Sequence, residues 1–239
     1  MPAKAGVSKP PLQELHGGFD TMLRITQPPC KKETNMTNTN ETLSLNKKLT
    51  LTGAFSALVI VLGITKLGFI TLGAAASITI LHIPVILICM LAGLPEGLFV
   101  GLVFGSLSLI QAAMSPTGAL DPFFVNPLIS VLPRMLIAVI AWGLWKSLNL
   151  IPRMPKTVAA GITGFITTVC HTLLVLGSLY IFKAADVKAA LGGMGYFALV
   201  GSCGFNAILE AVAATILCAA VFAGLFVADK KHSKLSEEN

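Results

Sequence analysis

Two charged side chains, Arg134 and Glu210, stand inside long apolar stretches of the sequence. A charge at the centre of a membrane helix costs at least about 2.5 kcal/mol, so such residues are rare and usually pair or line a polar pathway. Arg134 comes eight residues after Asn126, and Glu210 comes about as far into its own stretch. At about 1.5 Å per residue, both would lie about 12 Å below the same end of a bundle. Two interpretations stay open: an ion pair between helices, or a solute cavity that at least one of them faces.

Other polar side chains recur near that end of the predicted bundle. His82 and His171 can each offer a hydrogen-bond donor and an acceptor at neutral pH, which suits recognition of a polar solute. They can equally bond one helix to another, and neither has metal-ligand spacing to a second donor, so we expect no metal site. Asn206 precedes Glu210 by one turn, on the same face. The candidate solute-binding residues are His82, Gln111, Asn126, Arg134, His171, Asn206 and Glu210.

A proline directly precedes the buried arginine. Pro133 has no amide hydrogen, so it frees the backbone carbonyl one turn earlier and bends its helix. The freed carbonyl can accept a hydrogen bond from a solute or from a neighbouring side chain, and the sequence leaves both roles open.

Motifs of catalysis are missing from the sequence. It contains no Walker A motif, no GxSxG and no HExxH, so we expect no ATP hydrolysis, no catalytic residue and no bound cofactor. Uptake of a solute would then need energy from a partner. Two alternatives remain: a stand-alone carrier or channel for small solutes, and an intramembrane enzyme that pairs Glu210 with His82 or His171 as acid and base.

The composition is that of a membrane protein. Hydrophobic residues make up 54% of the chain and charged residues 12%, with a mean hydropathy of +0.81, whereas a soluble domain carries about 25% charged residues. The net charge of +6 does not indicate nucleic-acid binding, because the basic residues lie in tails and short loops. Six apolar stretches predict transmembrane helices at residues 49–70, 77–93, 96–114, 125–148, 157–182 and 200–228.

We therefore expect an all-α membrane protein, a compact bundle of six transmembrane helices in a lipid bilayer. Residues 1–48 would form a polar tail, 49–228 the bundle and 229–239 a charged tail; a native start at Met36 would make residues 1–35 an extension. Lysine and arginine concentrate beside both ends and in the fourth-to-fifth loop, which places both termini inside. The polar, glycine-rich residues 183–195 would form an outward loop with a short helix near 184–191.

Small residues recur every fourth position in two predicted helices. Gly93, Gly97, Gly101 and Gly105 form a repeated GxxxG ridge, and Gly53 and Ala57 make the same step in the first helix. Such ridges let helices approach closely. The third-helix ridge can pack within the molecule or serve as a docking face for another membrane protein.

Four segments of the sequence share a pattern with one family. They read SITILHIPVI (77–86), GLPEGLFVGLVFG (93–105), NPLISVLPR (126–134) and NAILE (206–210). Over about residues 45–228 the chain resembles the S components, the substrate-binding membrane subunits, of energy-coupling factor (ECF) transporters.

This resemblance implies a bundle in a bacterial-type cell membrane, with both termini cytoplasmic and a high-affinity vitamin pocket near the outer face. It implies three partners, two ECF ATPase subunits that use ATP and one transmembrane scaffold subunit. It also implies a docking motif of small residues in the first helix, which Gly53 and Ala57 match with one glycine for alanine. Pantothenate carriers look nearest, while riboflavin, folate and pyrimidine-precursor carriers share much of the pattern.

Overall fold

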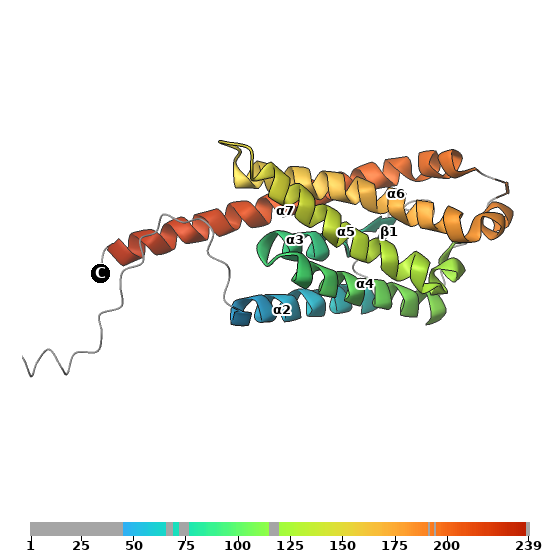
Figure 1. The fold of residues 1–239 in the computed structure, drawn as a ribbon, viewed down its shortest axis with the longest axis horizontal. Helices are drawn as coiled ribbons and strands as arrows, with labels where there is room; N and C mark the ends of the chain where they lie inside the picture. Colours follow the sequence, from blue (N-terminus) through green and yellow to red (C-terminus); the bar gives the residue numbers. More distant parts are fainter. Residues whose placement is uncertain are drawn as a thin grey trace, which may run out of the picture. The chain divides into compact units, whose positions relative to one another are not determined.

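The chain's apolar stretches fold mainly into helices, as a computed structural model shows for residues 45–65, 69–71, 77–114, 120–190, 192–193 and 195–237. Within these residues lie six α-helices, two short strands and one 3-10 helix (Figure 1). In chain order they are α2 (Leu45–Ile64), β1 (Phe69–Thr71), β2 (Ser77–Thr79), α3 (Ile83–Leu91), α4 (Leu94–Met114), η1 (Asp121–Val125), α5 (Pro127–Leu148), α6 (Lys156–Ala190) and α7 (Tyr196–Glu237). Residues 1–44, which include most of the predicted tail and Met36, lie outside the described part.

Five of the described helices are long and apolar enough to cross a membrane. They are Leu45–Ile64, Leu94–Met114, Pro127–Leu148, Lys156–Ala190 and Tyr196–Ala228. The chain is therefore a multi-pass membrane protein of helices, as its composition predicted. The expected boundaries are close to these for the third, fourth and sixth segments, and the fifth was expected to end at residue 182, before the end of its helix at Ala190.

The prediction of one helix over residues 77–93 is wrong, because the segment begins with strand β2 and its helix α3 has only nine residues. At about 1.5 Å per residue, α3 is about 14 Å long, less than half of a hydrocarbon core of about 30 Å. Ile83–Met90 are all buried, and α3 contacts α2, α4, α5, α6 and α7. Its high hydropathy therefore reflects burial inside the protein, and Figure 1 shows α3 among the longer helices.

The first predicted helix, 49–70, also ends too late. Helix α2 stops at Ile64, and Phe69–Thr71 form β1, which pairs antiparallel with β2. The register places Phe69 opposite Thr79. The strand β2 in turn contacts α7. A two-stranded sheet therefore leads the chain from α2 into α3.

Three glycines of the α4 ridge pack within the molecule. A Cβ atom at Gly97 would overlap Sγ of Cys89 on α3. A Cβ at Gly101 would lie 2.7 Å from the carbonyl oxygen of Arg134, and one at Gly105 would lie 2.7 Å from Cα of Val131, both on α5. This confirms the intramolecular interpretation of the ridge: glycine lets the α5 backbone approach α4 beside Arg134.

Helix α6 is interrupted where its predicted span ends. Lys183 has non-helical backbone angles, φ −142° and ψ 30°, so a short helical piece follows it to Ala190, as the sequence predicted. The Nζ atom of Lys183 lies 3.1 Å from Oδ2 of Asp186. Val187 in the short piece and Leu199 in α7 are buried in one apolar cluster. The polar loop residues are thus tied back onto the bundle.

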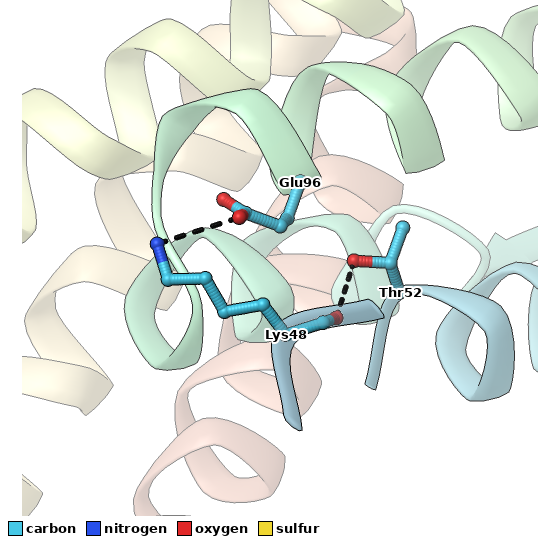
Figure 2. A network of polar contacts seen from close by, with 3 residues as sticks. All are labelled: Lys48, Thr52 and Glu96. Carbon is cyan, nitrogen blue, oxygen red and sulfur yellow. Dashed lines mark hydrogen bonds and ion pairs between the residues drawn. The ribbon is translucent and has the colours of Figure 1, made fainter. Parts of the chain in front are cut away.

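Helix α2 is attached to α4 near both of its ends. Near its start, Nζ of Lys48 lies 3.4 Å from Oε1 of Glu96, the third residue of α4 (Figure 2). Near its end, Nε2 of Gln111 donates a hydrogen bond of 2.5 Å to the carbonyl of Gly63. The last carbonyls of a helix have no partner within it. Gln111, predicted as a solute ligand, thus supplies one from α4.

Candidate functional site

The buried arginine bonds a backbone carbonyl that the proline beside it leaves free. Pro133 cannot donate to the carbonyl of Ile129, its partner in a regular helix. Nη1 of Arg134 donates to that carbonyl instead, at 3.1 Å. The sequence left open whether a solute or a neighbouring side chain bonds the freed carbonyl, and the structure shows a neighbouring side chain there. The proline therefore supplies an anchor for the guanidinium of an arginine residue that is only 7% exposed.

Two aromatic rings flank the same guanidinium. Cζ of Arg134 lies 5.5 Å from the ring centroid of Phe104 on α4 and 5.1 Å from that of Phe124 on η1. Such cation–π contacts contribute about 0.5–2 kcal/mol, most when the cation is removed from water. The Nε atom of Arg134 is buried and makes no hydrogen bond. The contacts orient the guanidinium and leave one donor unused.

The two histidines lie beside these aromatic residues. The ring centroids of His82 and His171 are 5.2 Å apart, and that of His171 is 6.1 Å from Phe104. Nε2 of His82 lies 2.9 Å from Oγ1 of Thr168, whose hydroxyl donates to the Gly164 carbonyl. Nε2 of His82 and Oγ1 of Thr168 form a hydrogen bond whose donor depends on the tautomer of His82. Nε2 of His171 is buried without a hydrogen-bond partner.

These side chains form what we call the Arg–His cluster. It joins α3, α4, η1, α5 and α6 around buried polar atoms that the protein leaves unpaired. An unpaired buried polar group costs about 1–3 kcal/mol, so such groups are rare in a native fold and are expected where a ligand binds. The cluster consists of His82, Phe104, Phe124, Arg134, Thr168 and His171.

The ion pair between Arg134 and Glu210, one of the two interpretations that the sequence left open, is not among those of the described residues. Within the described ranges, ion pairs join Lys48 to Glu96 and Lys183 to Asp186. Oε1 of Glu210 instead accepts a 2.7 Å hydrogen bond from the backbone amide of Thr79. Neither charge therefore serves as the other's structural partner. The bond to Thr79 also gives no support to an acid–base pair of Glu210 with a histidine.

Two other predicted ligands have partners within the protein. Oδ1 of Asn126 accepts from the amide of Leu128 at 3.0 Å, so Asn126 is the N-cap of α5. Gln111 bonds the end of α2, as described above. Asn206 is half-buried on α7, one turn before Glu210.

Three members of the Arg–His cluster were missed by the sequence analysis. Thr168 lies three residues before His171, so helical spacing could have placed both on one face of α6. Phe104 adjoins the glycine ridge, which signalled close packing against α5. Phe124 lies in a 3-10 helix, and no spacing rule connects it to Arg134. Its role depends on tertiary packing alone.

Comparison with known proteins identifies the group to which such a bundle belongs. A family model described as "ECF transporter, substrate-specific component" matches residues 47–222. A pantothenic acid transporter, PanT, of Lactococcus lactis subsp. cremoris is 29% identical over 162 residues, 62% of this chain and 76% of the relative. A pantothenate transporter, PanT, of Leuconostoc mesenteroides subsp. mesenteroides is 30% identical over 191 residues, 73% of this chain and 90% of the relative.

Proposed function

This chain belongs to the family of substrate-specific components of ECF transporters, and we propose that it binds pantothenate at the Arg–His cluster. Membership makes it the subunit that recognises a small molecule and works with partners of the ECF module. The solute, its contacts and the composition of the module are the proposed part. The names of the two relatives support pantothenate.

The unpaired donor of Arg134 is the observation that carries this proposal. Its Nε atom is buried without a partner, and neither ion pair of the described ranges includes Arg134. A carboxylate accepts charge-assisted hydrogen bonds from a guanidinium, and these are about twice as strong as neutral ones. Pantothenate has such a carboxylate. We assign that end of the solute to Arg134.

The remaining polar groups of pantothenate are an amide and two hydroxyls, which both donate and accept hydrogen bonds. Nε2 of His171 can bond one of these groups, and the His82 ring lies beside that of His171. The cluster thus offers different chemistry to the charged and neutral parts of one solute.

We also propose how the chain crosses the membrane and meets its partners. Residues 77–80, extended at about 3.3 Å each, together with α3 would span roughly 27 Å, so strand and short helix make one composite crossing. Six crossings would then put both termini inside a bacterial-type cell membrane. The partners are two ATPases, which bind the ATP, and one scaffold subunit. Gly53 and Ala57 are exposed on α2, and Gly53 has nothing within 4 Å of a built Cβ; they form the proposed docking face.

The test is equilibrium binding of radiolabelled pantothenate to the purified chain, with riboflavin, folate and orotate as competitors. Arg134→Gln should weaken binding by about 10- to 100-fold, the loss of a bond worth about 1.5–3 kcal/mol. Arg153→Gln is the matched control, because Arg153 is exposed in a loop. Panthenol carries an alcohol in place of the carboxylate, so it should bind the wild-type protein and Arg134→Gln equally.

Two results would overturn the proposal. If pantothenate does not bind while another competitor does, the solute is wrong. If Arg134→Gln weakens pantothenate and panthenol equally while the protein stays monodisperse, the carboxylate does not contact Arg134. Concentrative uptake by liposomes that contain this chain alone would favour the stand-alone carrier instead.

A further inference from the structure

The carboxylate of Glu210 bonds a backbone amide far away in the sequence. Oε1 accepts from the amide of Thr79 at 2.7 Å across 131 residues, and Glu210 is 8% exposed. Thr79 is the last residue of β2, in a sheet of two strands, so one edge of β2 has no strand partner. Non-helical backbone at membrane depth needs partners from the protein. Glu210 supplies one for this edge.

The tethered amide lies close to the Arg–His cluster along the chain. His82 follows Thr79 by three residues and is the N-cap of α3. The amide of Ile83 donates to the Ile80 carbonyl at 3.1 Å, so one tight turn separates β2 from α3. The His82 ring is fixed on its other side by Thr168. A displacement of Thr79 would therefore move the His82 backbone relative to its ring partner.

We infer that Glu210 is a positioning residue: it holds β2 through the Thr79 amide and thereby places His82 for the solute. This inference rests on the proposed function for its effect on binding. A direct contact between Glu210 and the solute is disfavoured, because a second carboxylate beside an anionic solute would repel it. What the site needs from residue 210 is an acceptor oxygen.

Two substitutions separate an acceptor from a charge. Glu210→Gln keeps an oxygen that can accept from the Thr79 amide and removes the charge. Glu210→Ala removes both. Glu96→Gln is the matched control, because Glu96 bonds Lys48 at the start of α4 and contacts no residue of the cluster in the described bonds. Each protein is compared by amide hydrogen exchange without solute and by pantothenate affinity.

The exchange of the peptide containing Thr79 should be at least about 10-fold faster in Glu210→Ala and within about 3-fold of wild type in Glu210→Gln. Peptides of α4 should be unchanged in both. The affinity for pantothenate should fall about 10-fold in Glu210→Ala and should stay within 3-fold of wild type in Glu210→Gln. In a His82→Asn background, Glu210→Ala should cost no further affinity, because its effect acts through His82.

Three results would overturn the inference. They are unchanged protection of Thr79 in Glu210→Ala, an equal loss of affinity in Glu210→Gln and Glu210→Ala, or additive losses in the His82→Asn background. A wild-type protein that binds no pantothenate would refute the proposed function instead. The exchange comparison, made without solute, would still decide whether Glu210 holds Thr79.

Discussion

Replacing Gly101 with alanine should disturb the Arg–His cluster without touching any of its side chains. The new Cβ would lie 2.7 Å from the Arg134 carbonyl oxygen, a backbone atom that cannot rotate away. Ordinary contacts begin near 3.4 Å, so α4 and α5 must separate by about 0.7 Å. Overpacking of this kind costs about 1–3 kcal/mol. The higher helix propensity of alanine returns up to about 1 kcal/mol, which leaves a net loss of up to about 2 kcal/mol when that gain is complete.

Gly143→Ala provides the matched control. Gly143 lies within α5 and has nothing within 4 Å of a built Cβ, so alanine should be neutral or stabilising there. Thermal unfolding in detergent, followed by the fluorescence of Trp142 and Trp145, should show Gly101→Ala melting up to about 8 °C below wild type. Its pantothenate affinity should fall about 10-fold, because the Arg134 backbone moves. If Gly101→Ala matches Gly143→Ala in both measurements, close approach at Gly101 does not position the arginine.

Three other substitutions test separate parts of the fold. Thr168→Val removes the hydroxyl that hydrogen-bonds the His82 ring and should weaken pantothenate binding about 10-fold, whereas Thr168→Ser keeps a hydroxyl and should bind like wild type; equal losses in both would show that this bond does not place His82 for the solute. Gly53→Leu should block capture of the ATPase and scaffold subunits in a pull-down while solute affinity stays within 3-fold, and Val61→Leu, also at an exposed position of α2, should leave both capture and affinity unchanged; assembly of Gly53→Leu at wild-type yield would move the docking face elsewhere. Lys48→Met leaves Glu96 without its ion pair at a half-buried position and should lower the melting temperature by about 2–4 °C at low salt; no change would show that the pair contributes nothing measurable.

The long helices could be predicted because their signal is local. A stretch of about 20 apolar residues must form a helix in a bilayer, whatever its neighbours are. The break after the fifth span was visible for the same reason, as polar residues and glycines follow Phe182. The second span was not predictable, because hydropathy cannot distinguish burial against lipid from burial against protein. Every residue from Ile83 to Met90 is apolar, and every one is covered by other helices.

The site was predictable in part. Arg134, His82 and His171 stood out because polar groups are costly in apolar segments, and the structure places all three in one cluster. Their partners were not predictable from depth along a helix. Matching depths suggested that Glu210 pairs with Arg134, but depth says nothing about which way a side chain turns around the helix axis. Glu210 bonds the backbone amide of Thr79. Every residue except proline has such an amide, so the sequence does not indicate which one a side chain will bond.

The shortest helix has a consequence for how this protein can vary. Helix α3 contacts all five long helices, and every residue from Ile83 to Met90 is buried. The space for each of these side chains is therefore set by its protein neighbours. Many apolar residues of α7, by contrast, are exposed in the fold, and the hydrocarbon of a bilayer would accept almost any apolar shape there. The short helix α3 should therefore tolerate substitutions less well than the long helix α7. A volume change of one methylene group should matter more in α3 than several such changes along the exposed side of α7.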